Sequence, residues 1–247
     1  MKKLVRLAYA KVNLYLNVFA RDKQGYHPLE TLFERIDLAD RLSFELKPKG
    51  QVSLTCDDPT LPTDQSNLVV KAAHAFLKVA RVQAGVSIHL NKRIPTAAGL
   101  GGGSSDAAAT LLGFNTLCGE PLSSDQLTHL GQSLGADVPF FLSDAALAWG
   151  KGRGDLIEPL PAPQAPLWHV LVFPNEPLLT KGVYEAFDRL SPTGGVLTAP
   201  KADATLLPRF VQAGDGVKAA PLLANALEPA IEASYPAIRG LKDALRK

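Results

Sequence analysis

The sequence predicts an α+β protein with two lobes, and three observations lead to this prediction. Alternating apolar and polar residues, typical of half-buried strands, recur within 4–55 and over 86–90. Stretches rich in helix-forming residues lie at 68–80, 107–112 and 123–134. The run Pro159-Leu160-Pro161-Ala162-Pro163 indicates a connection between lobes, because proline interrupts regular structure. We therefore expect lobes at 1–158 and 159–247.

The elements follow in order from the same patterns. The first strand is expected over 4–19, interrupted near Lys11, with a turn-rich loop after it at 21–25. Glycine and capping serines mark helix ends, so Gly135 is expected to close a helix that Ser124 or Asp125 opens. The further strands are expected at 31–37, 42–46, 52–55, 86–90 and 167–173, and the further helices at 68–80, 107–112, 180–190 and much of 204–247.

A glycine-rich run between a strand and a helix is the most informative feature of the chain. It reads Pro95-Thr96-Ala97-Ala98-Gly99-Leu100-Gly101-Gly102-Gly103-Ser104-Ser105-Asp106, and we expect Ser104 or Ser105 to cap the helix with Asp106 in its first turn. Glycine lets successive backbone N–H groups converge, and a helix N-terminus adds free donors and positive dipole charge. The run therefore predicts an anion site, most often for phosphate.

Neither of the two common phosphate loops fits this run. A Walker A loop needs a lysine where Gly103 stands, and the dinucleotide fingerprint needs a glycine where Ser104 stands. A flexible loop without a ligand is the alternative, and the position between strand and helix disfavours it.

Composition and charge exclude several other classes. The 247 residues carry 26 basic and 24 acidic side chains without a basic stripe, so a nucleic-acid surface is not expected. The two cysteines and five histidines lack metal-ligand or disulfide spacing. No signal peptide or membrane-spanning run is apparent, so we expect a cytoplasmic protein that contacts no membrane.

The glycine run closely resembles the second motif of the GHMP kinases, in which this loop wraps the phosphates of ATP. The resemblance implies a two-lobed fold with a mixed α/β N-terminal lobe and an α+β, ferredoxin-like C-terminal lobe. It also implies that residues 95–105 bind ATP together with Asn67, in Ser66-Asn67-Leu68-Val69. For Asn67, a helix N-cap role is equally well supported by the residues alone.

Two further segments resemble one branch of this family, whose acceptor is a diphosphocytidyl methylerythritol. Ala10-Lys11-Val12-Asn13-Leu14 resembles the branch's first motif, and Gly135-Ala136-Asp137-Val138-Pro139 the segment with its catalytic aspartate. The resemblance implies that Lys11 and Asp137 are catalytic and that Asn13 lies beside the acceptor. By themselves, Lys11 fits a strand-edge charge and Asp137 a cap or turn.

The same branch implies an acceptor pocket for a cytosine ring. Gly25-Tyr26-His27 and Phe33 resemble its base-holding segment, and Thr180 and Tyr184 resemble a segment that closes over the same substrate. An aromatic face stacks on a base, and a histidine can hydrogen-bond its polar edge. A turn with core aromatics, and an N-cap at Thr180, are the alternatives that the residues leave open.

The resemblance departs at the C-terminal end. Ala226 stands where the family has an acid, and the family's third glycine motif, expected soon after 235–238, is absent. We therefore expect a shortened chain that uses ATP and Mg²⁺, with the ion's ligands undetermined, and acts as a monomer or homodimer. Another small-molecule kinase of the family, similar to homoserine kinases, and a nucleotide-binding protein without turnover are the alternatives.

Overall fold

The computed structural model describes residues 2–47, 50–174, 180–190 and 204–245. The chain forms two compact units that interleave along the sequence. The first comprises Met1–Lys11, Arg35–Thr96 and Leu100–Asp144, and the second comprises Val12–Glu34, Ala97–Gly99 and Ala145–Lys247. This division cuts the chain differently from the predicted lobes, 1–158 and 159–247, which stay a prediction.

The first unit is built on a four-stranded part of a sheet with the order β3-β4-β2-β1. Its strands come from β1 (Lys3–Val18), β2 (Leu29–Lys47), β3 (Val52–Cys56) and β4 (Gly85–Asn91). β4 pairs antiparallel with β2 and parallel with β3. Val86, Ile88 and Leu90 of β4 are buried and alternate with polar residues, so one face of the strand is covered and the other is polar.

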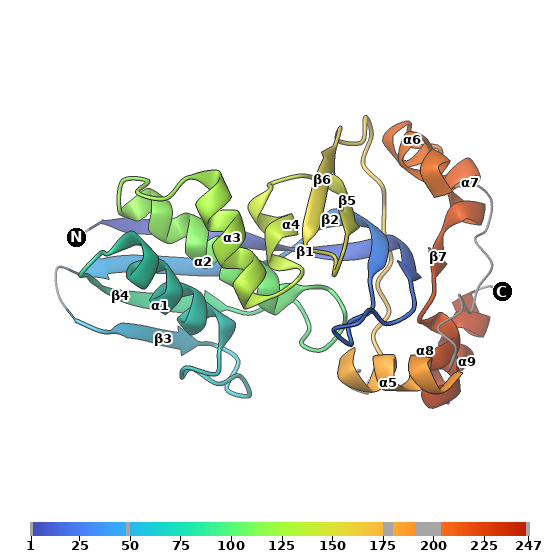
Figure 1. The fold of residues 1–247 in the computed structure, drawn as a ribbon, viewed down its shortest axis with the longest axis horizontal. Helices are drawn as coiled ribbons and strands as arrows, with labels where there is room; N and C mark the ends of the chain where they lie inside the picture. Colours follow the sequence, from blue (N-terminus) through green and yellow to red (C-terminus); the bar gives the residue numbers. More distant parts are fainter. Residues whose placement is uncertain (1, 48–49, 175–179, 191–203, 246–247) are drawn as a thin grey trace. The chain divides into compact units, whose positions relative to one another are not determined.

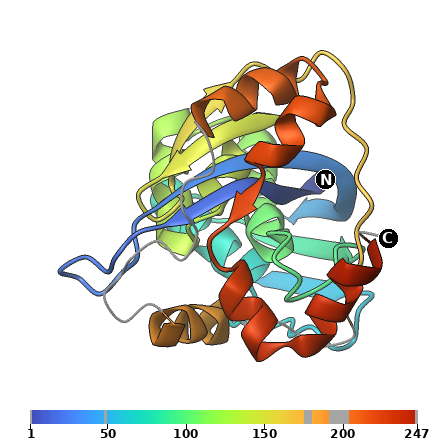
Figure 2. The ribbon, with the colours of Figure 1, turned by 90° about the vertical axis from the view of Figure 1, so that its right-hand side faces the viewer.

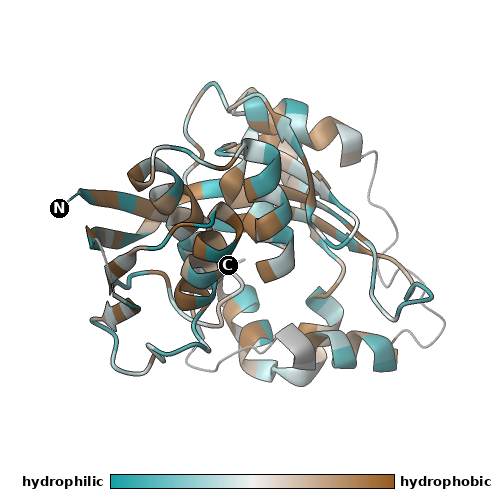
Figure 3. Cartoon of the chain, turned by 60° about the vertical axis from the view of Figure 1, so that its left-hand side comes forward, coloured by the Kyte–Doolittle hydropathy of each residue, from teal (hydrophilic) through white to brown (hydrophobic). Residues whose placement is uncertain are grey.

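Helices cover the apolar face of this unit (Figure 1). They are α1 (Leu68–Ala80), α2 (Gly102–Leu117), α3 (Ser124–Leu134) and α4 (Val138–Leu142). α1 is amphipathic and buries its apolar stripe, including Phe76, beside Phe114 of α2. Brown and teal segments alternate along the helices in Figure 3, as amphipathic packing requires. α3 begins with a capping box in which Ser123 and Gln126 each accept a backbone N–H.

The second unit continues β1 and β2 and adds short elements. β2 pairs antiparallel with β5 (Leu147–Lys151), and β5 pairs antiparallel with β6 (Leu156–Leu160). β1 pairs parallel with the short strand β7 (Ala224–Asn225), which lies beside it in Figure 2. The helices are α5 (Thr180–Leu190), α6 (Leu207–Gln212), α7 (Gly216–Ala219), α8 (Glu228–Ser234) and α9 (Pro236–Leu245), with 3₁₀ turns at Ala204–Leu206 and Ala220–Leu222. Phe187 of α5 and Ala230 of α8 meet Leu16 and Val18 in one apolar cluster.

The structure corrects several predicted elements in the sheet. The expected strands at 31–37 and 42–46 form the single strand β2, which pairs with β5 over 31–34 and with β4 over 41–47 and has β1 as its other neighbour. β1 is continuous through Lys11. β5 has no counterpart among the predictions, and Pro159 lies inside β6, opposite Ala148, instead of in a linker.

The largest error concerns 167–173, which forms no strand: this described segment has no regular secondary structure and pairs with no strand. Its side chains Trp168 and Val170 are exposed. The predicted helix at 180–190 is confirmed as α5, while the predicted loop at 191–201 lies outside the described residues. A search of the described helices for one with the length and apolarity to span a bilayer finds none.

Candidate active site

The glycine-rich run forms a loop of alternating left-handed residues before α2. Ala97, Gly99 and Gly101 have φ values of 54°, 74° and 70°. Such a left-handed alternation turns successive N–H groups toward one concavity. The first backbone hydrogen bond of α2 runs from Ser105 N to Gly101 O, so the N–H groups of residues 102–104 have no partner within the helix. The loop therefore has the donors of an anion site.

The N-cap prediction for this helix is wrong. Gly101, not Ser104 or Ser105, is the N-cap of α2, and Asp106 lies beyond the first turn. The helix begins after Gly101, which takes a left-handed conformation, and a side chain at either of two neighbouring positions would have to displace the groups packed there. A Cβ at Gly101 would lie 2.9 Å from Phe141 Cζ, and one at Gly102 would lie 2.9 Å from Lys92 Nζ. These glycines allow the loop to pack closely on its neighbours.

Lys11 and Asp137 lie together beside this loop, in the first unit. The Lys11 Nζ is 3.5 Å from Asp137 Oδ2, and the Lys11 side chain is buried while a third of Asp137 is exposed. The Lys11 backbone N–H donates to Leu100 O at 3.0 Å, which ties β1 to the glycine run. A Cβ at Gly101 would also lie 3.2 Å from Lys11 Cγ. The lysine is thus a buried cation beside a phosphate-type loop and not a strand-edge charge facing water.

A second buried cation, Lys92, lies beside the loop in a cluster of charges that the sequence did not predict. Lys92 Nζ hydrogen-bonds the carboxylates of Asp40 and Asp106, the latter at 3.0 Å. Asp40 Oδ1 also accepts the backbone N–H groups of Arg93 and Ile94, the latter at 2.8 Å. This Lys92 cluster joins β2, the chain before the loop and α2. The available signal was the pair Lys92-Arg93 directly before the loop, but no pattern marked Asp40.

Burial dominates the electrostatics of the Lys92 cluster. Loss of hydration raises the pKa of Asp106 to about 7, although the Lys92 ammonium opposes this. Its Oδ1 is buried without a hydrogen-bond partner among the described residues. For Lys92, burial lowers the pKa, and Asp106 and Asp40 more than reverse this effect, so the net pKa is raised. The lysine therefore stays charged, and Asp106 is the member of the cluster that titrates near neutrality.

In the second unit, His27 is held through both ring nitrogens. Nδ1 lies 2.8 Å from Phe19 O, and Nε2 lies 2.9 Å from Asp188 Oδ1 of α5. Arg21 pairs with the same carboxylate and, together with His27, holds the pKa of Asp188 below its usual range. The sequence analysis missed Arg21 and Asp188. The signal that could have found Asp188 is its place one helical turn after Tyr184.

Two aromatic residues accompany His27. The Tyr184 ring stacks on the His27 ring, with centroids 5.7 Å apart and planes inclined by 29°. Tyr26 is exposed, and the Arg153 guanidinium lies 5.7 Å from its ring centroid. Tyr26 thus presents a ring face that a planar group can reach, whereas Tyr184 supports the histidine.

The remaining predicted acceptor residues are fixed within the second unit. Asn13 donates from Nδ2 to Thr31 Oγ1 at 2.6 Å, and Thr31 in turn donates to Tyr15 O. Phe33 is only 2% exposed and packs at Gly150, where a Cβ would lie 2.6 Å from Phe33 Cε2. The burial of Phe33 fits the core role that its residue type also suggested. The side chain of Thr180 lies outside the described part of the chain.

Asn67, which was predicted to contact ATP, lies at the start of α1. Asn67 is the N-cap of α1: its Oδ1 accepts from Val69 N at 2.9 Å and its Nδ2 donates to Pro62 O at 2.7 Å. The cap role is thereby confirmed, and a nucleotide contact by Asn67 stays a prediction.

Within the described residues, no group of three His, Cys, Asp or Glu side chains could hold a metal ion by itself.

The chain is similar in sequence to a known family and to named proteins. Residues 67–145 match the family described as GHMP kinases N terminal domain. A protein of Salinibacter ruber called 4-diphosphocytidyl-2-C-methyl-D-erythritol kinase is 40% identical over 247 residues, which are 98% of this chain and 83% of the relative. A protein of the same name from Geobacter metallireducens is 40% identical over 246 residues, covering 99% of this chain and 83% of the relative.

Solved structures agree with these relatives. A crystal structure of 4-(cytidine 5'-diphospho)-2C-methyl-D-erythritol kinase has a TM-score of 0.74 at 35% identity and covers 98% of this chain and 82% of that one. A homoserine kinase from Cytophaga hutchinsonii has a TM-score of 0.56 at 18% identity, covering 96% and 78%. The second match concerns the fold alone. The predicted α+β class is confirmed as the GHMP kinase fold.

Proposed function

The chain belongs to the 4-diphosphocytidyl-2-C-methyl-D-erythritol kinases of the GHMP family, and we propose that Lys11 and Asp137 carry its chemistry. It is an ATP-dependent kinase of the non-mevalonate route to isoprenoid precursors. The reaction transfers the γ-phosphoryl group of ATP to the 2-hydroxyl of the diphosphocytidyl methylerythritol. The observation that carries the residue assignment is the buried Lys11 ammonium 3.5 Å from Asp137, beside the glycine loop.

The loop binds the phosphates of ATP in this proposal. Its left-handed residues and the free N–H groups at the start of α2 supply donors, and the helix dipole favours negative charge there. The Lys92 cluster fixes the strand end and α2 below the loop, so these donors are ordered before the nucleotide arrives. Order before binding lowers the entropic cost of binding.

Lys11 and Asp137 have different roles in the phosphoryl transfer. The partly exposed Asp137 carboxylate accepts or orients the proton of the acceptor hydroxyl. The Lys11 ammonium faces that carboxylate and stabilises negative charge on the phosphoryl group as it moves. Phosphoryl transfer depends mainly on positioning and charge stabilisation, so few protein groups are needed.

Recognition of the cytosine ring is assigned to the second unit. Tyr26 offers an exposed ring face for stacking. Both ring nitrogens of His27 are engaged by Phe19 O and Asp188, so hydrogen bonding of its ring to the base would require one of these contacts to break. Asn13, Phe33, Thr180 and Tyr184 stay predicted neighbours of this substrate, with Tyr184 acting through the His27 ring.

Mg²⁺ is part of the proposal because kinases of this kind use it to neutralise phosphate charge. Mg²⁺ in proteins commonly binds one or two carboxylates together with substrate phosphates, so a three-residue cluster is not required. Asp40 and Asp106 do not fit as its ligands, because both are buried against Lys92. A cytoplasmic location, where ATP is available, and a monomer or homodimer complete the proposal.

Substrate competition tests this function. ADP release would be measured with the diphosphocytidyl substrate, homoserine and mevalonate in parallel, with ATP and Mg²⁺ present. Turnover with the diphosphocytidyl substrate alone supports the proposal. Comparable turnover with homoserine would overturn the acceptor assignment, and ATP binding without turnover on any of them would indicate a nucleotide-binding protein.

A further inference from the structure

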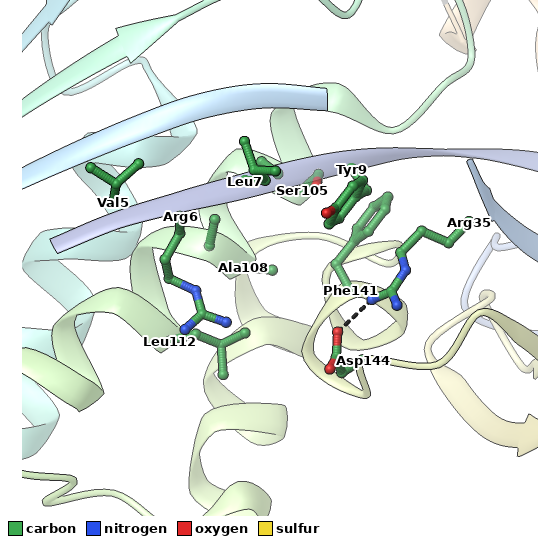
Figure 4. A pocket seen from close by; sticks show the side chains of 12 residues that line it. Val5, Arg6, Leu7, Tyr9, Arg35, Ser105, Ala108, Leu112, Phe141 and Asp144 are labelled. Carbon is green, nitrogen blue, oxygen red and sulfur yellow. Dashed lines mark hydrogen bonds and ion pairs between the residues drawn. The ribbon is translucent and has the colours of Figure 1, made fainter. Parts of the chain in front are cut away.

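Asp106 lies on a different face of α2 from the residues that line the neighbouring cavity. Ser105, Ala108 and Leu112 face a cavity of about 280 Å³ between α2 and β1 (Figure 4), and Asp106 does not belong to its lining. The Asp106 side chain is 3% exposed and pairs with Lys92 instead. Its Oδ2 accepts a hydrogen bond from Lys92 Nζ at 3.0 Å, whereas its Oδ1 is buried without a partner among the described residues. One oxygen of this carboxyl group is therefore out of contact with donors and with the cavity.

The other carboxyl group of the Lys92 cluster, that of Asp40, is fully engaged. Its Oδ2 accepts from Lys92 Nζ, and its Oδ1 accepts the backbone N–H groups of Arg93 and Ile94. Both oxygens act as acceptors, so a proton on Asp40 would displace one of these hydrogen bonds. Within the cluster, a proton can therefore be added without breaking a hydrogen bond at Oδ1 of Asp106.

The charges of the cluster do not balance. Lys92 contributes one positive charge, and the carboxylates of Asp40 and Asp106 contribute two negative ones, so the ionised cluster has a surplus of one negative charge. This surplus lies close to the start of α2, because a Cβ at Gly102 would be 2.9 Å from Lys92 Nζ and Asp106 follows about one helical turn later. Like charges in a poorly hydrated site repel strongly, so the surplus disfavours an anion at this helix start.

The surroundings of Asp106 do not remove this surplus. The charged groups that act on it are Lys92 and Asp40, and burial, the largest influence, raises its pKa to about 7. On β1, the Lys11 ammonium faces Asp137. α4 contains no ionisable residue, and the ionisable side chains of α1 and α3, which also pack against α2, are exposed: Lys71, His74, Lys78, Asp125 and His129.

We propose that Asp106 is a positioning residue for the nucleotide and that nucleotide binding takes up a proton at its Oδ1. The inference rests on the proposed function, in which the N–H groups of residues 102–104 bind the phosphates of ATP. With the proton in place, Lys92 and Asp40 balance each other and the cluster beside the phosphates is neutral. The hydrogen bond from Lys92 to Oδ2 is kept, so α2 stays joined to the segment before the loop. The proton comes from solvent and returns to it when the nucleotide leaves.

The affinity for ADP as a function of pH tests this inference. The full chain is titrated with ADP in excess Mg²⁺, which keeps the phosphates of the nucleotide deprotonated. We expect the dissociation constant to rise about tenfold between about pH 6 and about pH 8.5, because one proton has to be supplied at high pH. In Asp106→Asn, whose amide is neutral at every pH, the constant should stay nearly level. A level profile in the wild type, or an equal rise in Asp106→Asn, would overturn the proposal.

Asp57→Asn is the matched control for this titration. Asp57 Oδ1 accepts the backbone N–H of Lys92 at 2.8 Å, but its side chain is exposed. That hydrogen bond holds the pKa of Asp57 below its usual range, so Asp57 keeps its charge throughout the titration. The control should show the same rise in the dissociation constant as the wild type. Loss of the rise in both variants would overturn the assignment to Asp106, because any change near Lys92 would then suffice.

Calorimetry of the wild type measures the proton directly and needs no variant. ADP binding is measured at about pH 7.5 in two buffers that differ in their heat of ionisation, and the difference in binding heat gives the number of protons taken up. Uptake of most of one proton supports the proposal, whereas equal heats in the two buffers would overturn it and leave the proposed kinase function intact. Failure of ADP to bind at any pH would overturn the phosphate assignment of the loop together with this inference.

Discussion

Two segments have strand-like sequences, but only one of them, β4, forms a strand, whereas 167–173 does not. In β4, residues Val86, Ile88 and Leu90 are 0%, 2% and 1% exposed, between partners β2 and β3. In 167–173, Trp168 is 94% and Val170 87% exposed, and the described chain there has no ladder. Alternation of apolar residues favours a strand, but only a partner strand satisfies its backbone groups. The pattern therefore predicts a tendency, and the neighbours decide the outcome.

The segment at 167–173 is nevertheless attached through side chains, and its first residue, Leu167, packs against the apolar cluster that contains Leu32 and Leu147. His169 Nε2 lies 3.0 Å from Glu34 Oε2, a buried carboxylate on β2. Burial raises the pKa of Glu34, and His169 opposes this. These side-chain contacts stand in place of the two ladders that hold β4, so the segment is anchored by side chains and not by its backbone.

The functional groups differ between the units in a similar way. In the first unit, Lys11 and Lys92 are buried cations held by carboxylates and by the sheet. In the second, Tyr26 is exposed on a loop, and His27 is held by a carboxylate on α5. Groups that carry chemistry need fixed geometry, whereas a stacking face has to be accessible. This difference predicts which variants lower turnover and which lower substrate affinity.

The largest expected effect comes from Asp137→Asn, which keeps the shape of the side chain and removes its charge. If the carboxylate accepts or orients the acceptor proton, kcat falls ~10²–10⁴-fold, while ATP affinity stays close to that of the wild type. Steady-state kinetics and an ATP titration on the same folded variant measure both quantities. Near-normal kcat would remove Asp137 from the chemistry.

A paired substitution tests the contrast between the two strand-like segments directly. Ile88→Ala should lower the free energy of unfolding by about 2–5 kcal/mol, because it leaves a cavity in a packed sheet. Trp168→Ala should change it by less than about 0.5 kcal/mol, because that side chain is exposed. Urea unfolding of the wild type and both variants measures these changes in the free energy of unfolding. A large loss for Trp168→Ala would mean that the segment packs against something in solution.

Gly102→Val and Tyr26→Ala separate the two ligands. Valine at 102 would collide with Lys92 and Ile94 and should weaken ATP binding without altering the acceptor site. Tyr26→Ala should weaken the diphosphocytidyl substrate by about 1–3 kcal/mol, the scale of one stacked base, and leave ATP binding unchanged. Calorimetric titration with each ligand, on variants checked for native circular dichroism, provides the measurement. Equal loss of both ligands in either variant would contradict the assignment.

The smallest effect concerns the pH dependence of Asp106→Asn. Because the folded-state pKa of Asp106 is raised to about 7, its contribution to stability is complete below the unfolded value and declines as pH rises to about 7. The variant lacks this decline. The difference in unfolding free energy, variant minus wild type, should therefore increase between about pH 4 and about pH 7 and stay level above that. A constant difference over this range would show that Asp106 does not titrate there.

The sequence by itself determined the glycine-rich loop and most helices, and the resemblance of its motifs led to the family. The loop and the helices depend on local physics: glycines before a helix, capping residues and helical periodicity act within a few residues. α1 and α5 accordingly have the predicted bounds. Lys11, Asp137 and Asn13 came from the family resemblance, and the structure adds that Lys11 and Asp137 are neighbours.

Only the tertiary structure decided the features that depend on distant partners. Asp40 joins Lys92 and Asp188 joins His27 across 52 and 161 positions of sequence. β2 is one strand because partners continue along it, and 167–173 is not a strand because none does. The close packing of Phe141 on Gly101 and of Lys92 on Gly102 likewise comes from contacts that no local pattern shows. Long-range contacts satisfy backbone and charge in ways that a local pattern does not contain.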